Sequence, residues 1–180
     1  MKLFVLAGLF VGLCEGLFGW GSCPQPQLVG NFKGEAYMGR WFEGLRVEDM
    51  PFQHGECDMA EYTLQDDGYI KVVNSEFYGG TWKSAQGEAY CEESGHCHVR
   101  FSSWSPWADY KVLDTDYGSY SVVYSCSSFY LFHIHYAWVL ERKQGTNDLQ
   151  KFLSLLKQLG INSSDLHFTD HSECPLSNIN

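Results

Sequence analysis

Basic residues are scarce in this chain of 180 residues, which carries 12 Lys and Arg against 22 Asp and Glu and a formal net charge of −10. It has no arginine-rich or polybasic tract, so it lacks the clustered positive charge that binds nucleic-acid phosphates or an anionic membrane surface. We therefore expect no nucleic acid among its partners. The 12 Phe, 6 Trp and 11 Tyr residues can bury a large core, which excludes a wholly disordered chain and favours one compact domain.

The sequence also lacks the motifs of the common enzyme classes. It contains no Gly-x-Ser-x-Gly nucleophile motif, no zincin helix and no glycine-rich phosphate loop. The adjacent acids Asp66 and Asp67 precede Gly68, a pattern typical of a hairpin turn rather than of general acid–base catalysis. We expect a protein that is not an enzyme and that requires no cofactor.

Long hydrophobic runs are missing except at the start, where Lys2 is followed by the apolar run Leu3–Leu13 and then by small residues at Gly19 and Gly21. This pattern is typical of a secretory signal peptide, and the run is too short to cross the roughly 30 Å of a bilayer core. We predict a signal peptide over residues 1–21 and a secreted, extracellular domain over residues 22–180, with no membrane span.

Cysteine is well represented in that domain. Its six cysteines are Cys23, Cys57, Cys91, Cys97, Cys126 and Cys174. An even number in an oxidising compartment predicts three disulfides, although spacing alone cannot choose among the 15 possible pairings. Cys91 and Cys97 are close enough in the sequence to staple a hairpin. The sequon that begins at Asn162 predicts an N-linked glycan on a surface loop.

Two histidine pairs raise the question of a metal site. His96 and His98 flank a hairpin cysteine, but in an exported chain the cysteines there are better used as a disulfide, so we expect no metal. His133 and His135 share one strand face, and their outward parity favours a solvated or helix-covered position over chelation.

Alternating apolar and polar residues run from Arg40 to Leu140, broken by turn signals such as Asp66-Asp67-Gly68 and Gly79-Gly80. This pattern is typical of an antiparallel barrel or sandwich. We assign the apolar parity to the inward face. On the last two strands it comprises Tyr120, Val122 and Tyr124, and then Phe132, Ile134, Tyr136, Trp138 and Leu140.

One helix is predicted after these strands, with Asn147 as its N-cap and Gly160 as its stop. Its apolar stripe comprises Leu149, Phe152, Leu153, Leu156 and Leu159. Because that stripe lies on one face, we expect the helix to pack outside the sheet. A short extended piece around Leu166–Thr169 should follow.

Three short segments, taken in order along the chain, resemble the signature regions of the lipocalin family. They are Gly39-x-Trp41 in the first strand, Thr115-Asp116-Tyr117 in a late turn, and Arg142 after the last strand. The closer resemblance is to the apolipoprotein D-like branch, which has bilin- and carotenoid-binding members. It rests on the segments Tyr37–Glu43, Val122–Cys126 and Ala137–Leu140.

The resemblance implies an all-β fold, an eight-stranded up-and-down antiparallel β-barrel with one C-terminal α-helix packed outside. It also implies disulfide pairings that the spacing alone left open. These are Cys23 with Cys126 and Cys57 with Cys174, which leaves Cys91 with Cys97.

A barrel of this size has an interior just wide enough for one small ligand if one end is sealed. Trp41 can seal it, and the guanidinium of Arg142 can stack on that indole. Asp116 fits a turn-fixing acceptor better than a catalytic acid.

Ligand contacts are expected on the inward parity of the barrel. The resemblance places Tyr62, Asn74 and Trp138 at positions that contact ligand in the apolipoprotein D-like branch. Asp58, Asn74 and Glu76 share the inward parity, and burying them unpaired would be costly, which favours a wet cavity or a polar ligand group. The predicted ligand-binding set is Tyr62, Asn74, Trp138, Tyr136, Tyr124, Tyr120, Val72, Ile134, Glu76 and Asp58. The alternative is that some of these aromatics only fill the barrel.

These observations predict a secreted carrier of one small hydrophobic molecule, of the steroid, fatty acid, retinoid, carotenoid or bilin class. The alternative is a chromophore-binding pigment-protein subunit that forms homo- or hetero-oligomers through an aromatic rim, for which Trp104–Trp107 is the candidate loop. The family also includes prostaglandin D synthase, an isomerase with a free cavity thiol. That activity is not expected here, because all six cysteines of the domain can be paired.

Overall fold

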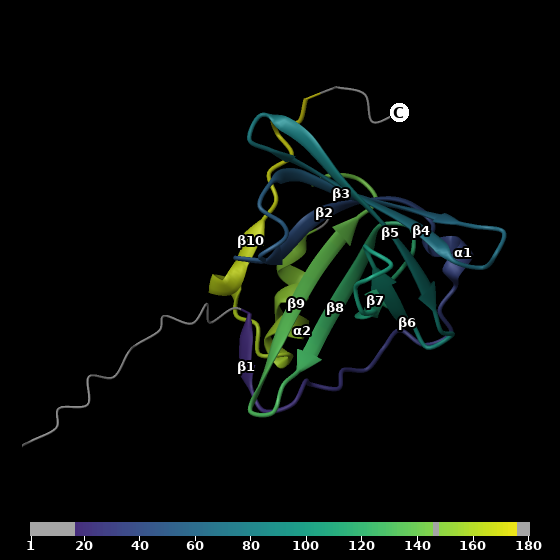
Figure 1. The fold of residues 1–180 in the computed structure, drawn as a ribbon. Helices are drawn as coiled ribbons and strands as arrows, with labels where there is room; N and C mark the ends of the chain where they lie inside the picture. The colour runs from purple at the N-terminus through teal and green to yellow at the C-terminus, as the bar shows by residue number, and fades with distance from the viewer. Residues whose placement is uncertain (1–16, 146–147, 176–180) are drawn as a thin grey trace, which may run out of the picture.

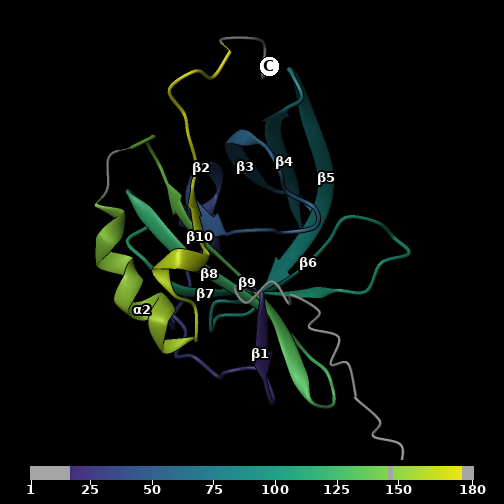
Figure 2. The same cartoon turned by 90° about the vertical axis from the view of Figure 1, so that its left-hand side faces the viewer.

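The structure, a computed structural model, describes residues 17–145 and 148–175. Eight strands, each antiparallel to the next along the chain, close into a barrel when the last pairs with the first (Figures 1 and 2). They are β2 (Gly39–Val47), β3 (Glu56–Leu64), β4 (Ile70–Tyr78), β5 (Thr81–Cys91), β6 (His96–Arg100), β7 (Ala108–Thr115), β8 (Tyr120–Ser128) and β9 (Phe132–Glu141). The barrel confirms the fold class that the alternating pattern and the resemblance predicted.

Two short strands extend the sheet beyond the barrel. β10 (Leu166–Phe168) pairs with β2, where the sequence predicted an extended piece. β1 (Phe18–Trp20) pairs with β9. The signal peptide over residues 1–21 stays a prediction, and cleavage after Gly21 would remove β1 with it. Among the described residues, no helix has the length and apolar character that a membrane span requires.

The expected helix lies outside the barrel, where Figure 2 shows it along one side. It starts as the 3-10 turn η1 (Leu149–Phe152) and continues as α2 (Leu153–Gln158). The predicted N-cap, Asn147, lies outside the described residues. Asp148 caps the helix through its carboxylate, which accepts a hydrogen bond from the backbone N–H of Gln150 at 3.1 Å. Gly160 ends it with φ of +85°, a value that favours glycine.

The helix packs against the outer face of β8 and β9 and buries the residues on that face. Ala137 and Val139 of β9 are fully buried in the cluster that includes Leu156 of α2, so the alternate residues of β9 face the interior as predicted. Val123 of β8 lies opposite Trp138 and also faces inward.

The parity predicted for β8 is wrong. Tyr124 is fully buried in the cluster on the helix side, and the ring of Tyr120 lies 4.8 Å from that of Phe152. An outer face covered by a helix needs apolar residues as much as an inner one does, so apolarity alone could not distinguish the two faces. Tyr120 and Tyr124 are therefore excluded from the interior.

Three disulfides join the pairs that the sequence and the resemblance predicted. They are Cys23–Cys126, Cys57–Cys174 and Cys91–Cys97. Two of them anchor the segments outside the barrel to its wall. His133 and His135 face outward and are buried beneath the N-terminal segment, with His133 Nδ1 3.1 Å from the carbonyl oxygen of Gly21.

A short helix, α1 (Gly34–Tyr37), precedes β2, and the 3-10 turn η2 (Ser163–Asp165) precedes β10. Because the turns alternate between the two ends of the barrel, the connections 48–55, 79–80, 101–107 and 129–131 share one end. The helix α1 and the turn 116–119 lie at the other.

Candidate functional site

The end of the barrel beneath α1 is sealed by Trp41, which is fully buried. The guanidinium carbon of Arg142 lies 3.7 Å from the centre of the indole, as the resemblance predicted. The same guanidinium donates to four backbone carbonyls at 2.8–3.2 Å. These belong to Ala36, Tyr37, Arg40 and Tyr117. Arg142 therefore ties α1, β2 and a late turn into one closed end.

The late turn is built as the sequence predicted. One carboxylate oxygen of Asp116 accepts backbone N–H groups of Gly118, Ser119 and Tyr120 at 2.7–3.1 Å. Slight burial would raise the pKa of Asp116, but hydrogen bonds from Ser119 and the backbone outweigh it and hold that pKa below its ordinary value. Thr115 accepts from the Tyr117 N–H at 2.9 Å. Asp116 and Thr115 therefore hold the turn in shape.

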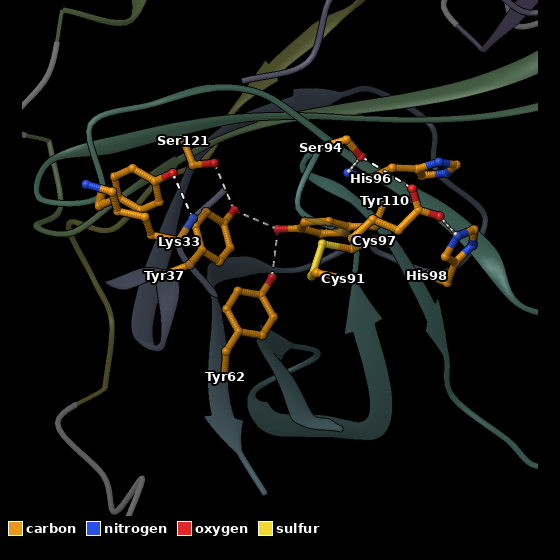
Figure 3. Close-up of a disulfide and its surroundings, with 12 residues drawn as sticks. Lys33, Tyr37, Tyr62, Cys91, Ser94, His96, Cys97, His98, Tyr110 and Ser121 are labelled. Atoms are coloured by element: carbon orange, nitrogen blue, oxygen red, sulfur yellow. Dashed lines mark hydrogen bonds and ion pairs between the residues drawn. A yellow bond between two sulfur atoms is a disulfide. The ribbon is translucent and has the colours of Figure 1, made fainter. Parts of the chain in front are cut away.

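A cluster of hydroxyl groups lies inside the barrel just above this closed end. Tyr37, from α1, lies within 3.0 Å of the Tyr110 hydroxyl and 2.8 Å of the Ser121 hydroxyl (Figure 3). The Tyr62 hydroxyl lies 3.0 Å from that of Tyr110. We call these four residues the tyrosine floor. Burial raises the pKa of Tyr62 to about 12 and that of Tyr37 and Tyr110 well above its ordinary value, so all three phenols stay neutral.

Of the tyrosine floor, the sequence predicted only Tyr62. Tyr110 alternates with Val112, so the same period-two argument could have found it. Tyr37 precedes the first barrel strand, and no pattern in the sequence shows that α1 folds back over the barrel.

The wall above the tyrosine floor is apolar and contains small residues. Val72, which the sequence placed on the inward face, and Ile70 are buried in the interior cluster. On β5, Ala85, Gly87 and Ala89 lie opposite Asn74, Val72 and Ile70 and therefore share their inward face. At Gly87 the ring of Phe101 and the backbone of Arg100 fill the space that a side chain would take, whereas Ala85 is exposed and leaves the wall open at its level.

Exposure shows that the upper part of the interior is open. Asn74 is exposed although it lies opposite Ala60 and Ala85 on the inward face. Ile134, Tyr136 and Trp138 are partly exposed, whereas their outward neighbours on β9 are buried. A strand that is more exposed toward the barrel than away from it borders a solvent-accessible interior. The predicted residues Asn74, Tyr136, Trp138 and Ile134 therefore lie on the inward face and keep solvent-exposed surface, and we call the part of the interior that they border, above the tyrosine floor, the cup.

The connection 48–55 crosses the mouth of this cup. Phe52 places its ring 5.0 Å from that of Tyr136 in an edge-on contact. The side-chain oxygen of Gln53 accepts a hydrogen bond from Trp138 Nε1 at 3.1 Å. Neither contact could be predicted from the sequence, because both residues belong to a loop without a repeating pattern.

Gln53 also joins a buried group of charges near the mouth. Its amide lies 2.5 Å from a carboxylate oxygen of Glu43 and 2.9 Å from one of Asp58. Arg46 Nη1 lies 2.7 Å from Glu43 and 3.5 Å from Asp58. Burial, and then the negative charge of Glu43, raise the pKa of Asp58 to about 7 against the opposing effects of Gln53 and Arg46.

These contacts refine two of the predicted ligand contacts. Asp58 is buried, as its parity suggested, but its partners are Arg46 and Gln53. The carboxylate of Glu76 accepts the backbone N–H groups of His54 and Gly55 at 2.9 and 2.7 Å, so it holds the mouth connection in place. The carboxylate of Glu76 is therefore satisfied within the protein, whereas Asp58 Oδ2 is buried without a hydrogen-bond partner and has only the ion pair with Arg46.

A separate groove of about 340 Å³ lies outside the barrel. It is lined by Gly44, Glu141, Gln144, Gly145, Leu149, Phe168, Thr169 and His171. It lacks the converging aromatic walls of the interior. We therefore place the candidate ligand site inside the barrel.

The predicted rim loop divides into an exposed part and a packed part. Trp104 is 94% exposed at the mouth, as the rim prediction requires. Trp107 instead packs against Tyr90 and Tyr69 and carries the guanidinium of Arg100 at 4.3 Å from its ring. Across the same end, Tyr130 is 98% exposed between β8 and β9.

Comparisons with known proteins agree with this architecture. A family model described as a lipocalin-like domain matches residues 33–171. Apolipoprotein D of Macaca fascicularis is 39% identical over 185 residues, covering 97% of this chain and 96% of that protein. Apolipoprotein D of Mus musculus is 36% identical over 184 residues with the same coverage.

Solved structures show the same fold. Insecticyanin from the tobacco hornworm Manduca sexta superimposes with a TM-score of 0.76 at 24% identity, covering 88% of this chain and 90% of that one. Lobster apocrustacyanin A1 superimposes with a TM-score of 0.68 at 23% identity, covering 79% and 82%.

Proposed function

This chain belongs to the lipocalin family, and we propose that it is a secreted carrier that binds one small hydrophobic molecule in the cup above the tyrosine floor. The observation that carries the proposal is the pattern of exposure along β9, where the inward residues Ile134, Tyr136 and Trp138 are more exposed than their outward neighbours. A preformed, mostly apolar hollow with a few polar groups is the usual form of a small-molecule site.

The ligand's apolar body would lie between Trp138, Tyr136 and Ile134 on one wall and Val72 on the other. Asn74 offers an amide to orient it. Release of ordered water from these faces is the driving force, at about 25 cal/mol for each Å² of apolar surface removed from water. Steroids, fatty acids, retinoids, carotenoids and bilins all match this chemistry.

The tyrosine floor would orient a polar end of the ligand. Three hydrogen bonds join its four hydroxyl groups, so among the described contacts the network has one more hydrogen to donate than it uses. Tyr62 stands at one end of this chain of bonds. A ligand carbonyl or hydroxyl that reached the floor would accept from it.

A matched pair of substitutions on β5 tests the location of the site. Ala85 faces the cup, and Gln86 faces outward on the same strand and is exposed. In calorimetric titrations with one compound from each ligand class, at least one compound should bind to the unmodified protein and to Gln86→Trp. Ala85→Trp should lose about tenfold or more in affinity, because an indole displaces the ligand's volume. Equal affinity of the two variants would place the ligand elsewhere.

A second candidate function is that of a chromophore-binding subunit of a pigmented assembly. The observation that favours it is the exposure of Trp104 and Tyr130 at the mouth, 94% and 98%, since large exposed aromatics favour association. The absorption spectrum and solution mass of protein purified from its source separate the two functions. A visible-absorbing oligomer supports the subunit, and a colourless monomer supports the carrier.

We also propose that the chain is not an enzyme. Every cysteine within the described residues is disulfide-bonded, which leaves no described thiol for an isomerase of the prostaglandin D synthase type. We also propose that Asn162, which is exposed at the start of η2, carries an N-linked glycan.

A further inference from the structure

Two imidazoles and a carboxylate meet on the outer face of the hairpin between β5 and β6. Each of Glu92, His96 and His98 offers a ligand atom, and these atoms all lie within 4.8 Å of one another. His98 Nε2 lies 3.7 Å from Glu92 Oε1, and the two imidazole ring centres are 4.4 Å apart. The sequence had associated these histidines with the neighbouring cysteines, but the cysteines form a disulfide and contribute no ligand.

The hairpin fixes these side chains near one another. The disulfide between Cys91 and Cys97 joins directly opposed residues of β5 and β6. The backbone N–H of Glu92 donates to the carbonyl of His96 at 2.9 Å, which closes the turn. His96 and His98 are two residues apart on one strand and therefore project on the same face. The backbone of the three residues is therefore fixed before an ion binds, and only side-chain freedom remains to be lost.

Neighbouring side chains support both imidazoles from the side. Asp109 Oδ1, on the adjacent strand, lies 3.1 Å from His96 Nε2, and a carboxylate partner of this kind orients a metal-binding histidine. Lys111 Nζ lies 3.0 Å from the other oxygen of Asp109, so its positive charge is offset there. The ring of Tyr90 stacks on His98 with centres 4.8 Å apart.

We propose that Glu92, His96 and His98 bind a divalent transition-metal ion of the Zn²⁺ type. Imidazole nitrogen with one carboxylate suits Zn²⁺, Cu²⁺ or Ni²⁺, whereas Ca²⁺ and Mg²⁺ take oxygen ligands. Four-coordinate zinc with bonds of about 2.0–2.1 Å holds its ligand atoms ~3.3 Å apart, so small side-chain rotations bring the three groups into range. Water fills the remaining position, since Glu92 is exposed and the two histidines are partly exposed.

The proposed metal site is separate from the ligand site. Figure 3 shows His96 and His98 on one side of the Cys91–Cys97 disulfide and Tyr37 and Tyr62 on the other, with the ring of Tyr110 beside the disulfide. The metal would therefore bind independently of a molecule in the cup, and the proposal does not depend on the carrier function.

Calorimetric titration of the disulfide-bonded protein with ZnCl₂ tests the proposal, with CaCl₂ as the comparison. We expect saturable binding of Zn²⁺ at this site and none of Ca²⁺. Glu92→Gln and His98→Gln should each weaken Zn²⁺ binding about tenfold or more. Glu93→Gln removes the same charge from the next residue of the turn, and His54→Gln removes an exposed imidazole from the other end of the barrel. Both should leave the affinity unchanged.

Cobalt provides a second readout that does not depend on affinity alone. Co²⁺ in a four-coordinate nitrogen and oxygen site should give visible d–d absorption that Zn²⁺ abolishes and that Glu92→Gln reduces. Because Glu92 is exposed on a turn, this variant retains the fold even if His98→Gln, which loses the contact with Tyr90, does not. Equal Zn²⁺ binding by Glu92→Gln and Glu93→Gln, or no binding to the unmodified protein, would overturn the proposal.

Discussion

Replacing Arg142 by Lys should destabilise the closed end of the barrel, although it keeps a positive charge over Trp41. Arg142 makes four hydrogen bonds from three nitrogens to carbonyls of three chain segments. A single ammonium nitrogen cannot reach all of them, because they lie around a planar fork. At least two bonds from a charged donor are lost, each worth about 1.5–3 kcal/mol, and water replaces part of that since the arginine is half-exposed.

The net loss in the free energy of unfolding for Arg142→Lys should be about 2–4 kcal/mol. For a chain of this length it lowers the melting temperature by about 4–16 °C. Arg142→Ala also removes the cation–π contact, which is worth a further ~0.5–2 kcal/mol. Urea denaturation, monitored by tryptophan fluorescence, measures the free energy of unfolding of both variants. Arg40→Lys is the control, because its ion pair with Glu61 is exposed and should be worth less than about 1 kcal/mol.

If Arg142→Lys is as stable as Arg40→Lys, the guanidinium does not hold the closed end together and the structural role assigned to it is wrong.

Two further perturbations test the buried charges and the disulfides. The pKa of Asp58 is about 7 in the folded state, against an ordinary value of 3.8. Between these two pH values the folded protein keeps a proton on Asp58 that the unfolded chain releases. The free energy of unfolding should therefore fall as the pH rises from about 4 to about 7. This fall is on the order of 2–4 kcal/mol, and Asp58→Asn should remove most of it. Urea denaturation at the two pH values measures the free energy of unfolding. If Asp58→Asn shows the same fall between the two pH values, Asp58 is not the group responsible. Cys57 and Cys174 are 117 residues apart and Cys91 and Cys97 only 6. By the chain-entropy model, serine substitution of the first pair should cost about 5 kcal/mol and of the second about 2 kcal/mol, and the reverse order in thermal melts would contradict the model.

The sequence predicted the barrel because alternation with a period of two is a local property of each strand. It predicted the inward face correctly on β9, where the histidines of the outer parity are clearly polar. It failed on β8, where Tyr120 and Tyr124 are apolar enough for either face and only the position of α2 decides between them. A helix that covers one side of a barrel removes the contrast on which the parity argument depends.

The candidate site was predicted in part for the same reason. Tyr62 and Trp138 lie on regular strands, so parity found them. Tyr37 and Gln53 lie in α1 and in the mouth connection, and they reach the interior only because the chain folds back across the two ends of the barrel. No periodicity reports such contacts, which depend on barrel closure.

Binding inside the barrel is the central claim, and fluorescence titration of Trp138 tests it most directly. Trp138 is partly exposed on the wall of the cup, so a lipophilic compound that enters should quench its emission or shift it to shorter wavelength. We predict that at least one steroid, fatty acid, retinoid, carotenoid or bilin gives a saturable change with one molecule bound per chain, and that Trp138→Phe loses this signal. A change that persists undiminished in Trp138→Phe, or no saturable change with any compound, would contradict the claim.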